Sequence, residues 1–179
     1  MTSVRLATTA DLPAILAISN EAALNTVANF AIDPEPLADW EMSYRNTSNT
    51  HPWLVAVTDE QVVGFAKASP WSGRCAYDYS VEVTVYVDPR HHRRGVGGAL
   101  YSRLFEILTR QGYNAALGGI TLPNEASVRL HEAFGMQHVA TFERVGWKFN
   151  QWHDVGYWQK HLQEDPTASP QLRLVADVV

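Results

Sequence analysis

The chain has 179 residues and a formal net charge of −5, which fits one domain with its own core and argues against a dedicated, basic nucleic-acid binder. Its single cysteine, Cys75, excludes a disulfide framework and fits a reducing compartment, and no apolar run approaches membrane-spanning length. We therefore expect a cytoplasmic protein with neither nucleic-acid nor membrane partners.

The first third of the chain predicts a strand, two helices and a hairpin. Val4–Ala7 favours a strand, and capping residues at 8–11 precede a helix with apolar residues at 12, 15, 16, 18 and 22. The stretch 25–33 has no period and is predicted to be a loop that leads to a second helix over 34–45. Segments 53–57 and 62–69 favour two strands joined by a short polar turn.

The stretch 80–110 predicts a strand, a glycine-rich turn and a helix. The valines at 81, 83, 85 and 87 fall on one face, so Glu82, Thr84 and Tyr86 share the other. The basic turn 91–98 opens a helix with apolar residues at 96, 100, 104, 107 and 108. Free amides at a helix start bind anions, so we expect this turn to hold a pyrophosphate. The alternative is a solvated run of charges.

The remaining segments complete a mixed sheet. Residues 115–122 favour a buried strand, 123–133 a short helix, and 139–149 with 152–162 a strand pair in which Gly146 forms a kink or bulge. The tail 163–179 is expected to be loosely attached, with an edge strand over 172–179 as the alternative. This order predicts an α+β (α/β mixed sheet) fold, with one domain over 1–162.

The element order and the turn His92-Arg93-Arg94-Gly95-Val96-Gly97 resemble the GNAT superfamily of N-acetyltransferases, whose coenzyme A signature is Gln/Arg-x-x-Gly-x-Gly/Ala. Histidine stands at the first position of that signature. Residues 27–162 more closely resemble the phosphinothricin and methionine-sulfoximine acetyltransferases. The matching segments include Asn29-Phe30, Ala76-Tyr77-Asp78, Leu122-Pro123-Asn124, His131-Glu132-Ala133 and Trp152-His153-Asp154-Val155-Gly156.

The resemblance implies a GNAT-like fold, acetyl-CoA as cosubstrate, no metal, and direct transfer without a covalent enzyme intermediate. The sequence contains neither a CxxC nor an HExxH motif, which would indicate a metal site. The expected cofactor-binding residues are Val85, Tyr86, Val87, Arg93, Arg94, Gly95, Val96, Gly97, Gly98, Asn124 and Ser127. An amide of the central strand is the expected oxyanion donor.

Two side chains are the catalytic candidates. Glu82 projects toward the face where the substrate should sit and, by resemblance, takes the proton of the amine. The alternative for Glu82 is a solvated carboxylate. His131 stands where the general superfamily pattern has a tyrosine, and it is an acid, a base with Glu82, or an orienting group. The alternative for His131 is a surface histidine.

The substrate implied by the resemblance is a small amino-acid analogue: L-phosphinothricin, methionine sulfoximine or methionine sulfone. A zwitterion with a polar head favours a guanidinium and aromatic walls. The candidates are Phe30, Arg74, Cys75, Ala76, Tyr77 and Thr84, with Trp71 beside them. Cys75 is interpreted as a packing residue. Acetylation would confer resistance to inhibitors of glutamine synthetase.

Two alternative functions remain at this point: a protein or peptide N-acetyltransferase, and a non-catalytic coenzyme A sensor. The aromatic residues Trp147, Trp152 and Trp158 indicate either core packing or an interface, and a homodimer is expected. The role of Trp152-His153-Asp154 is structural, dimer-forming or chemical.

Overall fold

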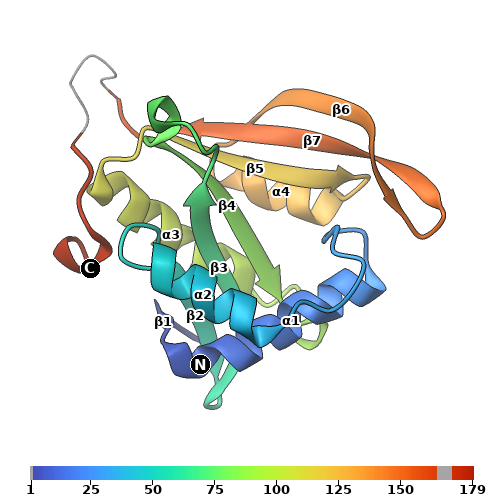
Figure 1. The fold of residues 1–179 in the computed structure, drawn as a ribbon, viewed down its shortest axis with the longest axis horizontal. Helices are drawn as coiled ribbons and strands as arrows, with labels where there is room; N and C mark the ends of the chain where they lie inside the picture. Colours follow the sequence, from blue (N-terminus) through green and yellow to red (C-terminus); the bar gives the residue numbers. More distant parts are fainter. Residues whose placement is uncertain (1, 165–170) are drawn as a thin grey trace.

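A mixed sheet of seven strands forms the centre of the computed structural model, which describes residues 2–164 and 171–179 (Figure 1). The strand order is β1-β2-β3-β4-β5-β7-β6. All neighbours are antiparallel except β4 and β5. The strands are β1 (Ser3–Leu6), β2 (Trp53–Thr58), β3 (Gln61–Pro70), β4 (Ser80–Val87), β5 (Ala115–Leu122), β6 (Gln137–Lys148) and β7 (Gln151–His161). The predicted mixed sheet is confirmed.

Four α-helices cover the sheet: α1 (Leu12–Asn25), α2 (Leu37–Thr47), α3 (Val96–Gln111) and α4 (Glu125–Ala133). Side chains alternate between the two faces of the sheet along each strand, and each face packs into its own hydrophobic core. Leu54, Ala66 and Val83 face α3, whose Leu100 and Leu104 are fully buried. The opposite face sends Val55 and Phe65 into a second core with α1 and α2. None of the helices in the described ranges is long and apolar enough to cross a membrane.

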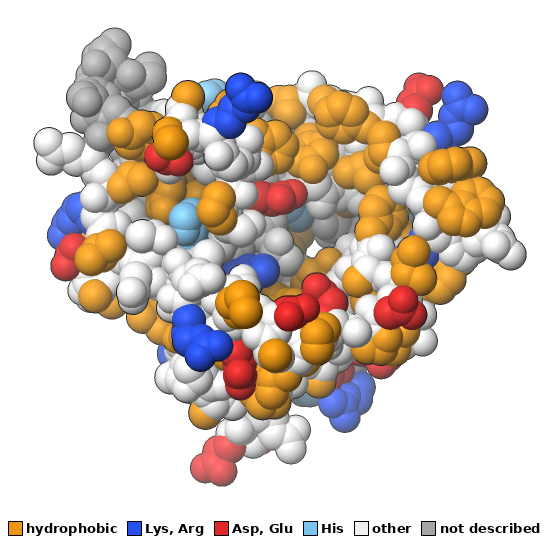
Figure 2. All heavy atoms as spheres, viewed as in Figure 1, with side chains coloured by type: hydrophobic (Ala, Val, Ile, Leu, Met, Phe, Trp, Pro, Cys, Tyr) orange, Lys and Arg blue, Asp and Glu red, His pale blue; other side chains and the backbone are white. Residues whose placement is uncertain are grey.

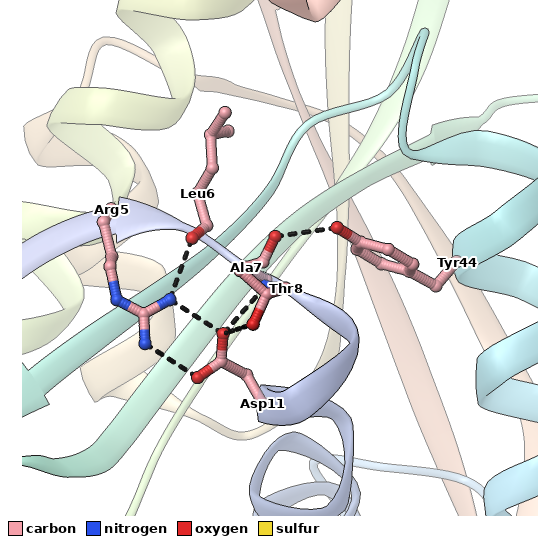
Figure 3. A network of polar contacts seen from close by, with 6 residues as sticks. All are labelled: Arg5, Leu6, Ala7, Thr8, Asp11 and Tyr44. Carbon is pink, nitrogen blue, oxygen red and sulfur yellow. Dashed lines mark hydrogen bonds and ion pairs between the residues drawn. The ribbon is translucent and has the colours of Figure 1, made fainter.

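A polar network fastens β1 to the first two helices (Figure 3). The Arg5 guanidinium donates to both carboxylate oxygens of Asp11, at 2.7 and 2.8 Å. Asp11 also accepts from the Thr8 amide at 2.7 Å, which caps the short 3-10 turn before α1. The Tyr44 hydroxyl of α2 donates to the Ala7 carbonyl at 2.7 Å. The N-terminal strand and the residue after it are therefore held by Asp11, just before α1, and by Tyr44 of α2.

Two segments differ from their predicted form. Helix α2 begins at Leu37, not at 34, because Pro36 adopts an extended conformation as its N-cap. Residues 171–179 do not add an edge strand but contain a 3-10 turn at Val175–Asp177. The prediction that these residues are loosely attached is also wrong, since Val175 and Val178 are buried. The part of the predicted tail at 165–170 lies outside the described residues.

Candidate active site

Strands β4 and β5 separate along their length. They pair only at Ser80–Ala115, Val81–Ala116 and Glu82–Leu117. Beyond these pairs β4 stays with β3 and β5 with β7, so the two strands diverge (Figure 1). Backbone groups of 83–87 on the β5 side therefore have no strand partner in the described part of the chain. An extended ligand arm can pair there in the manner of an added strand.

The turn before α3 opens beside this gap. Gly95 is the N-cap of α3 with φ +79°, a left-handed conformation that favours glycine, and Arg93 is left-handed at +58°. The first amides of α3 have no intrahelical acceptor and lie at the positive end of its dipole. The side chain of Val96 is buried, so only its backbone can reach a ligand. The turn fits a pyrophosphate because the free amides at the start of α3 directly follow the exposed Arg93 and Arg94.

His92, which replaces the usual first residue of the signature, has a local role. Its Nε2 lies 2.8 Å from the Val87 carbonyl, and since a carbonyl only accepts, this nitrogen carries the hydrogen. The ring thus ties the turn back to the end of β4.

Glu82 lies on the sheet face that carries α1 and α2. Burial raises the pKa of Glu82, and the charge of Lys67 opposes that rise. Lys67 comes from β3, where it pairs with Thr84, and its ammonium lies 4.8 Å from the Trp40 ring and 4.5 Å from the Trp53 ring. Glu82 is only partly exposed, which favours the base interpretation over a fully solvated carboxylate.

A cavity of about 250 Å³ opens on the same face, between the two N-terminal helices and β3–β4. It is lined by Ser19, Asn29, Glu35, Asp39, Trp40, Ser43, Phe65, Lys67, Thr84 and Tyr86. Figure 2 shows a hollow near the centre of this view, with acidic and basic side chains around it. The sequence predicted Thr84 and Tyr86 as site residues but not Lys67. The position of this lysine within an otherwise apolar strand could have indicated it.

Aromatic side chains extend this face across β7. Tyr157 stands opposite Gly119 of β5, and a Cβ at Gly119 would meet its ring at 3.3 Å. The ring of Trp71 lies 5.3 Å from Tyr157, edge to face, and Phe142 lies 5.7 Å away on the β6 side. Burial, and then the charge of Glu82, raise the pKa of Tyr157. Sequence reasoning named Trp71 and missed Tyr157.

The loop between α1 and α2 contacts both β4 and β6. The Tyr86 hydroxyl donates to the Ala28 carbonyl at 2.8 Å, so this predicted cofactor-strand residue holds the loop that carries Phe30. The Phe30 ring lies against Gly146, where a Cβ would approach it to 2.2 Å. The predicted bulge is confirmed, since the β6–β7 register shifts between Phe142 and Gly146.

The predicted substrate residues at 74–77 form an exposed 3-10 turn, Cys75–Tyr77. Cys75 is an exposed free thiol, so its interpretation as a packing residue is wrong. No hydrogen bond or ion pair of the described residues joins the side chains of 74–77 to Glu82 or Thr84. The turn therefore has no polar contact with these two residues, although it directly precedes β4.

His131 lies on the other side of the sheet, against α3. Its Nδ1 is 2.8 Å from the Ser127 carbonyl, and its Nε2 is 2.9 Å from the Tyr101 hydroxyl. Because the carbonyl only accepts, Nδ1 carries the hydrogen, and the neutral ring accepts from Tyr101 at Nε2. Burial lowers the pKa of His131, which favours this neutral form. The surface-histidine interpretation is wrong, since the residue is 4% exposed.

Helix α4 begins at a side-chain cap. The Asn124 side-chain oxygen accepts from the Ser127 amide at 3.1 Å. The side-chain nitrogen of Asn124 has no hydrogen-bond partner among the described residues and can contact a ligand. The Ser127 hydroxyl lies 3.5 Å from His131 Nδ1.

Within residues 2–164 and 171–179, no three His, Cys, Asp or Glu side chains gather in an arrangement that could hold a metal ion.

The acetyltransferase (GNAT) family matches residues 15–136 of the chain. Taken with the divergent β4–β5 pair and the turn at α3, this match shows that the chain belongs to the GNAT family and is an N-acetyltransferase, as the sequence predicts.

Individual members of the family are similar to this chain over most of its length. The chain is 41% identical over 160 residues to phosphinothricin N-acetyltransferase of Streptomyces viridochromogenes, covering 89% of this chain and 87% of that one. It is 34% identical over 171 residues to the L-methionine sulfoximine/L-methionine sulfone acetyltransferase of Salmonella typhimurium, covering 94% and 98%. A GNAT superfamily phosphinothricin acetyltransferase from Sinorhizobium meliloti, solved in complex with AcCoA, has a TM-score of 0.91 at 30% identity, covering 99% and 97%.

Proposed function

We propose that the protein transfers the acetyl group of acetyl-CoA to the α-amine of a small amino-acid analogue. The candidate acceptors are L-phosphinothricin, methionine sulfoximine and methionine sulfone. The observation that carries the proposal is the position of Glu82, a partly buried carboxylate at the point where β4 and β5 diverge. The names of the relatives support this choice of acceptor.

Acetyl-CoA supplies the activated acetyl thioester, and this chain supplies the surfaces that hold it. The backbone of Val85–Val87 would pair with its extended arm, and residues 93–98 would hold its pyrophosphate. The free amide nitrogen of Asn124 and the hydroxyl of Ser127, at the start of α4, would contact it from the opposite side of the gap. A free amide of the central strand would donate to the oxygen of the acetyl carbonyl.

Glu82 is the proposed base. An amino-acid amine is protonated near neutral pH and must lose a proton before it can attack. Burial raises the pKa of Glu82 and makes it a better proton acceptor, while Lys67 favours the ionised form that can accept. The neutral amine attacks the acetyl carbonyl, the C–S bond breaks and coenzyme A leaves as the thiolate. Of the two protons that the amine gives up, one protonates this thiolate and the other passes through Glu82 to water.

His131 is proposed to orient α4 and not to exchange a proton with the substrate. The neutral ring uses both nitrogens within the protein, toward Ser127 and Tyr101. The ring also packs closely on Gly118 of β5. A Cβ at this position would lie 2.7 Å from the ring, so only glycine fits there. These contacts fix the start of α4, which carries Asn124, relative to β5.

The acceptor is proposed to lie on the Glu82 face. Phe30, Trp71 and Tyr157 provide aromatic surface, and Thr84 a hydroxyl. Arg74, Cys75, Ala76 and Tyr77 would contact the acceptor from the exposed turn, with the guanidinium of Arg74 toward its carboxylate or polar head. The resistance that such acetylation confers on glutamine-synthetase inhibitors is part of this proposal. The single cysteine supports action in the cytoplasm.

We propose a homodimer formed through the β6–β7 pair. The rings of Trp147 and Trp152 lie 5.2 Å apart across these strands and are 51% and 57% exposed. Phe142 and Phe149 are exposed beside them, and hydrophobic side chains gather over these strands in Figure 2. Exposed aromatic patches of this kind mark protein interfaces. Trp158 is not part of the patch, because it is buried.

Thiol release from acetyl-CoA tests the proposed reaction. The panel contains L-phosphinothricin, methionine sulfoximine, methionine sulfone and N-terminal peptides, and we expect turnover with at least one of the amino-acid analogues. Turnover with peptides alone would identify a peptide acetyltransferase, and binding of acetyl-CoA without turnover would identify a sensor. Either result would contradict the proposed acceptor.

A further inference from the structure

The ammonium of Lys148 is buried without a carboxylate partner. The residue is 5% exposed, and none of the ion pairs among the described residues includes it. Its Nζ donates instead to three backbone carbonyls, those of Ala23, Asn29 at 2.6 Å and Ala31 at 2.8 Å. An ammonium has three N–H donors, so all three are used.

All three carbonyls belong to one segment more than a hundred residues away from Lys148 in the sequence. Ala23 lies in the last turn of α1, where carbonyls lack intrahelical partners and the helix dipole favours a cation. Asn29 and Ala31 flank Phe30 in the loop between α1 and α2. Lys148 therefore connects the end of a helix, the loop after it, and β6.

The β6–β7 pair is built to hold Lys148 and Phe30 in place. The His153 Nε2 donates to the Lys148 carbonyl at 3.0 Å, and His153 pairs with Gly146 across the two strands. The Phe30 ring lies 6.1 Å from the His153 ring and against Gly146, where no larger residue fits. This gives the histidine of Trp152-His153-Asp154 a structural role.

The same loop is also held from the other side. The Tyr86 hydroxyl of β4 donates to the Ala28 carbonyl, and the Asn29 side chain donates to the Ser19 hydroxyl at 3.2 Å. Ser19, Asn29 and Tyr86 all line the cavity beside Thr84. Residues 26–33 thus lie between the cavity and β6, and their position decides the shape of the acceptor side of the site.

We propose that Lys148 is a positioning residue, which holds loop 26–33 closed over the acceptor site through its three carbonyl contacts. The inference rests on the proposed function, because it assumes that the acceptor amine binds on the side of the loop that faces the cavity. Loss of the ammonium would leave three carbonyls unsatisfied and free the loop. The amine would then bind only to the fraction of molecules whose loop is closed, and its KM would rise in proportion.

The first test is hydrogen exchange on the free protein, which needs no substrate. In K148M we expect the amides of Ala28 and Ala31, which donate to the side chains of Thr26 and Asn29, to exchange about tenfold faster or more, because their exchange follows the open fraction of the loop and that fraction rises when the ammonium is lost. K160M is the matched control, because Lys160 also donates to a helix-end carbonyl, that of Phe134 at 2.6 Å, but lies far from this loop. It should leave the exchange of the Ala28 and Ala31 amides unchanged. Unchanged exchange of this loop in K148M would overturn the proposal, whatever the substrate.

The second test is kinetic and uses the acceptor that the thiol-release panel identifies. K148M should raise the KM of the amine by roughly tenfold while the KM of acetyl-CoA and kcat stay within about threefold. An equal loss in both KM values, or in kcat alone, would contradict a loop-positioning role. If K148M does not fold, K148R replaces it, because its planar guanidinium cannot reproduce three converging contacts. We expect the amides of this loop to exchange faster in K148R than in the wild type, and wild-type exchange would overturn the proposal.

Discussion

Glu82 and His131 lie on opposite faces of the sheet. Glu82 pairs with Leu117 of β5, whereas the His131 ring packs on the next residue, Gly118. Because neighbouring residues of a strand point to opposite faces, the carboxylate and the imidazole cannot share a proton directly. A mechanism that uses both as one acid–base pair is therefore disfavoured, and the two residues make separate predictions.

Replacement of Glu82 by glutamine should lower kcat by roughly 100-fold or more, the range expected for a group that transfers a proton. The KM of acetyl-CoA should stay unchanged, since the side chain faces the acceptor side. Glu35→Gln is the matched control, because Glu35 is a carboxylate in the same cavity. A kcat close to wild type in E82Q would remove Glu82 from the mechanism.

His131→Asn should reduce stability more than it alters the pH profile. The Tyr101 hydroxyl is fully buried and would lose its acceptor, at a cost of about 1–3 kcal/mol in the free energy of unfolding. Chemical denaturation measures that loss. Because His131 is neutral and bonded at both nitrogens, the limbs of the pH profile of kcat/KM should not move. If a limb disappears in H131N, the residue is an acid or a base in the reaction.

Lys67→Met should move the acidic limb of the kcat/KM profile to higher pH. Burial raises the pKa of Glu82, and the Lys67 charge lowers it, so removing the charge raises the pKa further. Glu82 would then ionise only at a higher pH. K67R retains the charge and should keep the limb near its wild-type position. A limb that does not move in K67M would show that it belongs to another group.

The sequence predicts the fold well because the relevant signals are local. The alternation of 81–87 and the glycine-rich turn at 95–98 define the central strand and helix without any distant contact. The aromatic and ionic parts of the site depend on register. Tyr157 reaches the Glu82 face because it stands opposite Gly119, and Lys67 is partly buried because Trp40 and Trp53 converge on it. Only the folded chain brings Lys148 to the loop at 29–31.

Asp11 makes stability depend on pH at the acidic end. The Arg5 hydrogen bonds hold the pKa of Asp11 at about 2, below its ordinary value of 3.8. The folded state therefore gains stability above pH 3.8, and this gain is lost as the pH falls through about 2. Asp11→Asn should cost about 1–2 kcal/mol at pH 7, since Arg5 is half exposed. The difference between wild type and D11N, measured by denaturation, should shrink between pH 4 and pH 2, and a constant difference would contradict the role given to the ion pair.

Substitution of the exposed aromatic pair tests the dimer. Light scattering should give the wild type about twice the chain mass of 20.0 kDa, because burial of the Trp147 and Trp152 rings in a second copy removes a large apolar surface from water. The double variant W147S/W152S should have the mass of one chain, with its unfolding transition still cooperative. Met42→Ser is the control, since Met42 is also 57% exposed but lies on α2, and it should remain dimeric. A wild type of 20.0 kDa, or a double variant that stays dimeric, would place the interface elsewhere or remove it.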